Sequence, residues 1–310
     1  LSTIQNGKSY HFYWHQADQH NLGEQGSIRY AQAFIQGRAL YALSRWRNAS
    51  NDPTAGKISD LLREYVLGVD NSELWRSPDL IRFPSEKGQF VGQIHSYVGA
   101  VNGLLENIRP LKTTHPHAFA GYTAFAQEVY DFVKRRTRTG PVGHFGEVGT
   151  VGDMIRLGLL LTELGVSDNW EDVDAWTRNA LAEAQIDDQV AHHIPNYSTS
   201  PHYAWVNVGS KSKGLFLSDT THIFDMPTNK NFRYNPDGPA NAMRAMHEVW
   251  KNIVNVQNDF IAINLLMNRT HRFLDVKSHL PYRGRAEIIT KSKIGSLRQM
   301  GVRIPPWGRA

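Results

Sequence analysis

Helical periodicity covers most of the first 256 residues, and this pattern limits the chain to an architecture built mainly from α-helices. Apolar residues recur there at spacings of three and four, as the buried face of a helix requires. The segments of this kind are approximately Ser27–Trp46, Ile58–Leu67, Phe90–Ile108, Ala118–Val133, Gly149–Leu164, Trp170–Ala184 and Ala240–Val254. Because no strand pattern separates them, we expect residues 1–256 to form one domain of helices packed on helices.

The pattern changes near residue 257, where short β-prone runs replace the helical periodicity. These runs are Phe260–Met267, Phe273–Val276, Ala286–Ile289 and Met300–Ile304. We expect residues 257–310 to form a separate β-strand element resembling part of a sandwich. The sequence leaves open whether this element packs on the helices or belongs to a longer natural domain.

A glycine-rich turn before the helix expected from Gly149 is the strongest candidate for a catalytic site. It carries His144 and Glu147, and Gly143, Gly146 and Gly149 leave open space beside the acid. We therefore predict that Glu147 and His144 act in catalysis. The alternative is that Glu147 only complements the positive end of the helix dipole.

Composition excludes several classes of site and partner. The chain has no cysteine, so it has no disulfide, no thiolate nucleophile and no cysteine-bound zinc. Its net charge of +5 is spread along the chain, so nucleic-acid binding is not expected. No apolar run is long enough for a membrane span. The chain opens on Leu rather than Met, which fits a processed or trimmed product. The compartment stays undecided, with a secreted or periplasmic location slightly favoured over the cytoplasm.

Several segments resemble the β-L-arabinofuranosidase-like glycoside hydrolases, the group of families 127 and 146. The segments are Gly92–Tyr97, Gly143–Glu147, Trp170–Asp174 with Arg178 and Asn179, Asn264–Arg269, Leu274–Gly284 and Val302–Trp307. The resemblance covers most of the chain from about Phe90. It implies a mainly α fold, an (α/α)6-barrel-like helical toroid followed by a C-terminal β-sandwich element, of which the four β-prone runs would form at least a part.

The resemblance also shows what this chain lacks. Better-studied members of the group hold a zinc ion with one glutamate and three cysteines, one of which is the nucleophile. Glu147 matches the glutamate of their Glu-Thr-Cys segment, but Gly149 stands where the cysteine is expected. The paired cysteines fall on about Asp237 and Gly238. We therefore expect neither a metal nor another cofactor.

Glycoside cleavage without that zinc normally needs two carboxyl groups. Glu147 and Asp237 are the candidate pair; about 5 Å between their carboxyl groups would imply retention of configuration, and roughly 6.5 to 9.5 Å inversion. Asp237 also fits a turn or helix cap.

Five further residues are candidates for binding the substrate: His95, Tyr97, Trp205, His202 and Arg244. Their structural alternatives are a core histidine at 95, an ordinary salt bridge at 244, and, for 202–205, a small core within the long loop of residues 192–233.

Three functions remain open from the sequence. The first is a glycoside hydrolase acting on polysaccharide or oligosaccharide. The second is a polysaccharide lyase on a similar helical toroid, in which Tyr and His perform β-elimination. The third is a non-catalytic carbohydrate-binding relative, because loss of the family's nucleophile is also what decay of an enzyme looks like. A helical barrel supports many chemistries, so the fold does not choose between them. The oligomeric state cannot be inferred.

Overall fold

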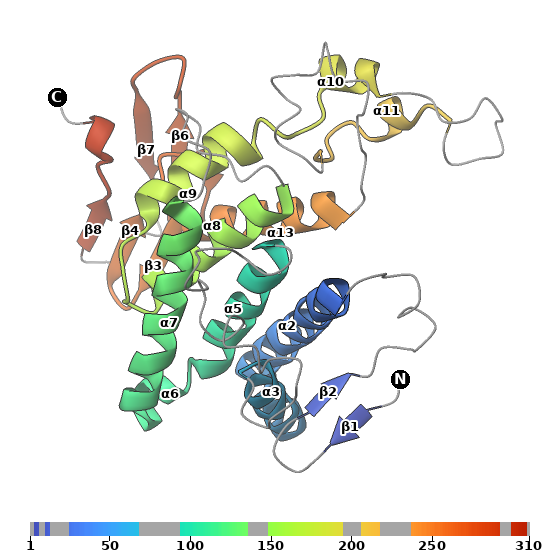
Figure 1. The fold of residues 1–310 in the computed structure, drawn as a ribbon. Helices are drawn as coiled ribbons and strands as arrows, with labels where there is room; N and C mark the ends of the chain where they lie inside the picture. The colour runs from blue at the N-terminus through green and yellow to red at the C-terminus, as the bar shows by residue number, and fades with distance from the viewer. Residues whose placement is uncertain are drawn as a thin grey trace. The chain divides into compact units, whose positions relative to one another are not determined.

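The structure is a computed structural model that describes residues 3–5, 10–12, 25–67, 94–135, 148–194, 206–217, 237–291 and 299–308 (Figure 1). Contacts divide the chain into two compact units. Unit 1 comprises Leu1–Arg138 and Arg156–Asp168, and unit 2 comprises Thr139–Ile155 and Asn169–Ala310. Each unit is described by itself below.

The described chain is mainly helical, as the periodicity predicts. The α-helices are α2 (Gln25–Ser50), α3 (Pro53–Val66), α5 (Ile94–Ile108), α6 (Leu111–Thr114), α7 (Pro116–Arg135), α8 (Val148–Glu163), α9 (Trp170–Trp176), α10 (Asp188–His193), α11 (Val208–Lys211) and α13 (Asp237–Asn252). A π-helix, η1 (Thr177–Leu181), continues α9, and a 3-10 turn, η3 (Pro306–Gly308), lies near the C-terminus. Each of the seven predicted helical segments contains an observed helix, although their ends differ. None of the described helices is long and apolar enough to cross a membrane.

In unit 1, α2 and α5 lie side by side and meet at small residues (Figure 1). A Cβ atom placed on Gly37 would lie 2.6 Å from Ala100 Cα, and one on Gly103 would lie 2.8 Å from the carbonyl oxygen of Gly37. Both distances are well below an ordinary carbon contact of about 3.5 Å. The absence of side chains at these glycines therefore allows the two helix backbones to approach closely.

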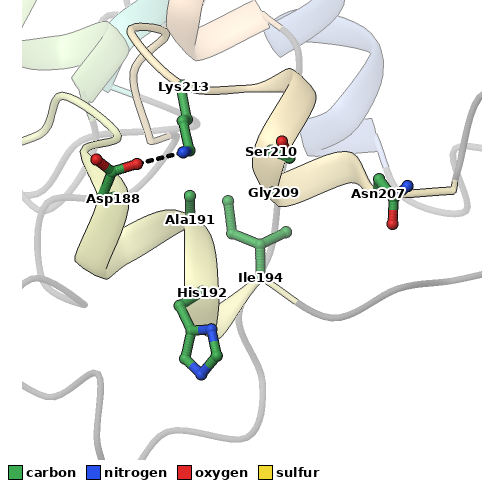
Figure 2. Close-up of a pocket in the computed structure, with 8 residues that line it drawn as sticks. All are labelled: Asp188, Ala191, His192, Ile194, Asn207, Gly209, Ser210 and Lys213. Atoms are coloured by element: carbon green, nitrogen blue, oxygen red, sulfur yellow. Dashed lines mark ion pairs between the residues drawn. The ribbon is translucent and has the colours of Figure 1, made fainter.

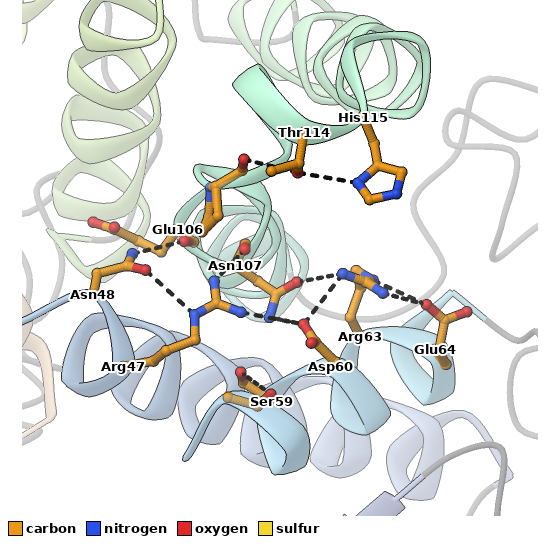
Figure 3. A network of polar contacts seen from close by, with 12 residues as sticks. Arg47, Asn48, Ser59, Asp60, Arg63, Glu64, Glu106, Asn107, Thr114 and His115 are labelled. Atoms are coloured by element: carbon orange, nitrogen blue, oxygen red, sulfur yellow. Dashed lines mark hydrogen bonds and ion pairs between the residues drawn. The ribbon is translucent and has the colours of Figure 1, made fainter. Parts of the chain in front are cut away.

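A polar network ties the three helices α2, α3 and α5 together (Figure 3). Arg47 of α2 donates to Asp60 of α3 at 3.2 Å and to the carbonyl oxygen of Asn107 in α5. Asn107 is buried; its amide donates to Asp60 at 3.1 Å and accepts from Arg63 at 2.9 Å. Because the buried amide of Asn107 is satisfied by the partly exposed Asp60 and Arg63, the network stabilises a single arrangement of the three helices.

Asp52 caps the beginning of α3. Its carboxylate accepts hydrogen bonds from Trp46 Nε1 at 3.1 Å, from the backbone N–H of Thr54 at 2.8 Å and from that of Ala55 at 3.3 Å. The bond from Trp46, followed by the two backbone bonds, lowers the pKa of Asp52 below its ordinary value of 3.8. The ionised carboxylate is therefore the form that stabilises the helix start.

We expect Asp52→Ala to lower the melting temperature at neutral pH. Since the folded pKa lies below 3.8, this stabilising contribution is fully present above that value and is lost as the pH falls through the folded pKa. The difference in melting temperature between wild type and Asp52→Ala should thus shrink in acid. Asp52→Asn keeps a capping oxygen without the charge and serves as the control. A wild-type to Asp52→Ala difference that is the same at about pH 2 and about pH 7 would contradict this account.

Unit 2 contains two small three-stranded sheets, whereas the short pair β1 (Thr3–Gln5) and β2 (Tyr10–Phe12) belongs to unit 1. In the first sheet, β4 (Phe260–Ile263) lies between antiparallel β3 (Val254–Gln257) and parallel β8 (Gln299–Val302). The second is the antiparallel sheet of β5 (Arg269–Thr270), β6 (Leu274–Ser278) and β7 (Ala286–Thr290). Alternate residues of β4 and β6 are buried, as a sheet with one covered face requires.

The change from helices to strands was predicted near residue 257 but occurs slightly earlier. Val254, predicted as the end of a helix, is the first residue of β3. Strands β3 to β8 also belong to the same compact unit as helices α9, α10, α11 and α13. Whether residues 257–310 form a separate element therefore stays a prediction.

Candidate catalytic site

Helices α8 and α13 contact each other in unit 2 close to the residue at which each helix begins. A Cβ atom on Gly152 would lie 3.1 Å from the carbonyl oxygen of Asn241 and 3.4 Å from Ala245 Cβ. Gly152 is the fifth residue of α8, and Asn241 is the fifth residue of α13. With a rise of 1.5 Å per residue, each helix begins about 6 Å along its axis from this contact.

A buried carboxylate lies next to this contact. Asp153 is 1% exposed, and its Oδ1 lies 3.7 Å from Nη2 of Arg244 on α13. The same Arg244 nitrogen donates to the side-chain oxygen of Asn241, one turn earlier on its own helix. An ionised carboxylate removed from water requires such a cationic partner. The Asp153–Arg244 pair therefore joins the two helices beside the glycine contact.

A double-mutant cycle measures how strongly this pair couples α8 to α13. We expect Asp153→Asn and Arg244→Met each to destabilise the protein, and the double variant to lose less than the sum of the two. Because the Arg244 side chain is 33% exposed and partly screened by water, we expect a coupling free energy of about 1 kcal/mol. Urea unfolding of the four proteins gives the value. Additivity within about 0.3 kcal/mol would show that the pair does not couple the helices.

The two predicted catalytic acids flank this junction in the sequence. Asp237 is the first residue of α13, although its side chain lies outside the described part of the structure. Glu147 also lies outside the described residues, and it immediately precedes Val148, the first residue of α8. The helix that follows Glu147 and the helix that begins at Asp237 are therefore the two that meet at Gly152 and Asn241.

The other predicted site residues fall into two groups. His144, His202 and Trp205 lie outside the described residues. His95 and Tyr97 belong to α5 in unit 1, and both are buried.

His95 lies against Arg38 of α2. Nη2 of Arg38 is 3.3 Å from Nδ1 of His95 and 3.2 Å from Nε2. One guanidinium nitrogen of Arg38 thus contacts both nitrogens of the imidazole ring. This contact suits the structural alternative of a core histidine, and it leaves the substrate-binding role a prediction.

Three of the segments that carry the family resemblance meet in unit 2. Arg178 pairs with Asp174 at 2.9 Å and donates to the carbonyl oxygen of Leu266 at 2.8 Å. Arg303 pairs with Glu171 at 2.8 Å. Burial raises the pKa of Asp174, while the Arg178 guanidinium acts in the opposite direction. These bonds connect residues 170–179, 264–269 and 302–307, three stretches that are distant in sequence.

The donor set does not fit the zinc centre that the resemblance implies. Position 149 is a glycine in the buried first turn of α8, position 238 is a glycine in the first turn of α13, and the chain has no thiol. Within the described residues, no group of three or more His, Asp and Glu side chains lies close enough to hold a metal ion. No catalytic step is therefore assigned to zinc.

Sequence reasoning missed Asp153. Residues 148 to 161 of α8 are all buried, and only Asp153 and Arg156 carry charges among them. An acid in a mainly apolar and continuously buried stretch of helix is the pattern that identifies it, because a buried charge must be paired.

No protein-family model matches this chain, and no curated protein matches it. The family resemblance thus rests on the quoted segments.

Proposed function

We propose that this protein is a glycoside hydrolase that cleaves a polysaccharide or oligosaccharide with the carboxyl groups of Glu147 and Asp237, without a thiolate-bound zinc. The observation that carries the proposal is the contact between α8 and α13 at Gly152 and Asn241. In the sequence, Glu147 immediately precedes α8 and Asp237 is the first residue of α13. Glycoside cleavage normally needs two carboxyl groups on either side of the scissile bond. Two helices that meet near their first residues can supply such a pair.

Glycoside cleavage needs one protonated and one ionised carboxyl group, so the two acids take different roles. Asp237 begins α13, whose N-terminus favours an ionised carboxylate, and the same helix carries the cationic Arg244. Glu147 also precedes a helix N-terminus, but the residue that follows it, Val148, is fully buried and the first turn of α8 carries no charged residue. We therefore assign Glu147 the role of proton donor to the leaving oxygen. We assign Asp237 the attack on the sugar or the activation of water.

The remaining candidates would bind substrate around these acids. His144, three residues before Glu147, would hold a sugar hydroxyl or assist the leaving group, because imidazole both donates and accepts hydrogen bonds. We also propose that the helices belong to an (α/α)6-barrel-like toroid followed by a β-sandwich element. The contacts among residues 170–179, 264–269 and 302–307 support this, because the segments that suggest the family also lie together in unit 2.

The test is incubation of the protein with a panel of plant, algal and microbial polysaccharides. We expect new reducing ends on at least one glycan, without an increase in ultraviolet absorbance. A lyase would instead form an unsaturated product that absorbs in the ultraviolet. Binding without either product would support a non-catalytic relative, and both of these results would overturn the proposal.

A further inference from the structure

Helices α10 and α11 of unit 2 form a small rigid frame within the long region that the sequence leaves without a regular pattern. The segments that flank them are paired by backbone bonds, from Ile186 N to Leu215 O at 2.7 Å and from Leu217 N to Ala184 O at 2.8 Å. Asp187 caps α10 by accepting from Val190 N at 2.8 Å. Buried apolar side chains fill the space between the helices: Ile186, Ala191, Ile194, Val208 and Leu217. Backbone bonds between the flanking segments and a buried apolar core therefore both stabilise this frame.

The two helices touch through their backbones. A Cβ atom on Gly209 of α11 would overlap the carbonyl oxygen of Ala191 on α10, so only glycine fits this position. Beside this contact the frame has a hollow of about 400 Å³ (Figure 2). That volume lies within the range of small-ligand sites. Ala191 and Ile194 supply apolar surface in the hollow, and both belong to the buried core of the frame.

The other side chains that line the hollow are polar. Asp188 of α10 and Lys213, just after α11, form an ion pair at one side (Figure 2). His192, Asn207 and Ser210 add groups that both donate and accept hydrogen bonds. The charges of Asp188 and Lys213 cancel. A lining of donors and acceptors without net charge matches the hydroxyl groups of a neutral sugar, and the apolar surface suits its C–H groups.

We propose that the hollow between α10 and α11 binds a neutral saccharide unit, at a site separate from the junction of α8 and α13. The choice of a saccharide rests on the proposed function. Because backbone bonds hold the frame, binding orders mainly its exposed side chains, such as those of Asp188 and Lys213. An anionic sugar gains less, since Asp188 offsets the attraction of Lys213.

Amide NMR spectra of the isotope-labelled protein test this proposal, with cellotriose, xylotriose and maltotriose as neutral probes and trigalacturonate as the charged probe. We expect the Gly209 and Ser210 amides to shift saturably with at least one neutral probe. Ser210→Trp should fill the hollow and lower the affinity by about tenfold or more. Lys211→Trp is the matched control, since Lys211 is exposed on the same helix and does not line the hollow. In the two Trp variants, affinity is followed at the Gly209 amide.

Two results would overturn the saccharide site: no shift at Gly209 and Ser210 with any neutral trisaccharide, or equal affinities in Ser210→Trp and Lys211→Trp. Saturation by trigalacturonate alone would equally overturn it. The NMR measurement does not depend on turnover, so its failure differs from failure of the proposed function. A protein that binds xylotriose here and hydrolyses no glycan would sustain the site and refute the hydrolase. Hydrolysis of a glycan without any binding at Gly209 would support the hydrolase and refute the saccharide site.

Discussion

Glu147→Gln is expected to lower kcat for glycan hydrolysis by about a thousandfold, because the amide cannot donate the proton that the leaving oxygen needs. That loss corresponds to about 4 kcal/mol of transition-state stabilisation. KM should change little, since Gln keeps the shape and most hydrogen bonds of Glu. The loss should be smaller on aryl glycosides, whose phenolate leaving groups need less protonation. Initial rates on a natural glycan and on its nitrophenyl glycoside provide the comparison.

Glu183→Gln is the matched control for this variant, because Glu183 is an exposed acid in the turn after η1. It should keep full activity. Circular dichroism should show that both variants fold. Full activity of Glu147→Gln would remove this residue from the mechanism. An equal loss on both substrates would remove it from the role of proton donor.

Gly103→Ala is expected to lower the free energy of unfolding of the protein by about 2 kcal/mol. The new methyl group would lie 2.8 Å from the carbonyl oxygen of Gly37 and 3.0 Å from the backbone nitrogen of Tyr41. These are backbone atoms, so relief requires that α2 and α5 move apart. Urea unfolding measures the change.

Gly121→Ala on α7 provides the matched control, because a Cβ atom there meets nothing within 4 Å. In a helix without such contacts, alanine is more stable than glycine by about 0.5 to 1 kcal/mol. The two substitutions should therefore change stability in opposite directions. If Gly103→Ala stabilised the protein as much as Gly121→Ala does, the close contact between α2 and α5 would be refuted.

The helices were predictable because burial of one face imposes a period of 3.6 residues, which the sequence displays directly. Prediction of the helices from this period is less accurate where a tertiary contact alters a helix or where a helix is too short to show the period. Trp170–Ala184 was expected as one helix, but it ends as the π-helix η1, beside Arg178 and its bond to Leu266. Helices α10 and α11 have six and four residues, too few to show a period.

The candidate site was predictable only in part. The turn that contains Glu147 and the first residue of α13 were identified from their glycines and from the family resemblance. The contact between Gly152 and Asn241 joins residues 89 positions apart, and local patterns contain no information on such a pairing. The same limit applies to the hollow between α10 and α11, whose lining comes from two segments that do not adjoin in the sequence.

Product analysis after hydrolysis in ¹⁸O-labelled water tests the central claim most directly. If Glu147 and Asp237 direct water onto the sugar, the wild-type protein will place ¹⁸O at each new reducing end, and Glu147→Gln will form almost none of this product. Mass spectrometry of the released oligosaccharides measures both. Unsaturated products without ¹⁸O, or undiminished labelled product from Glu147→Gln, would contradict the account.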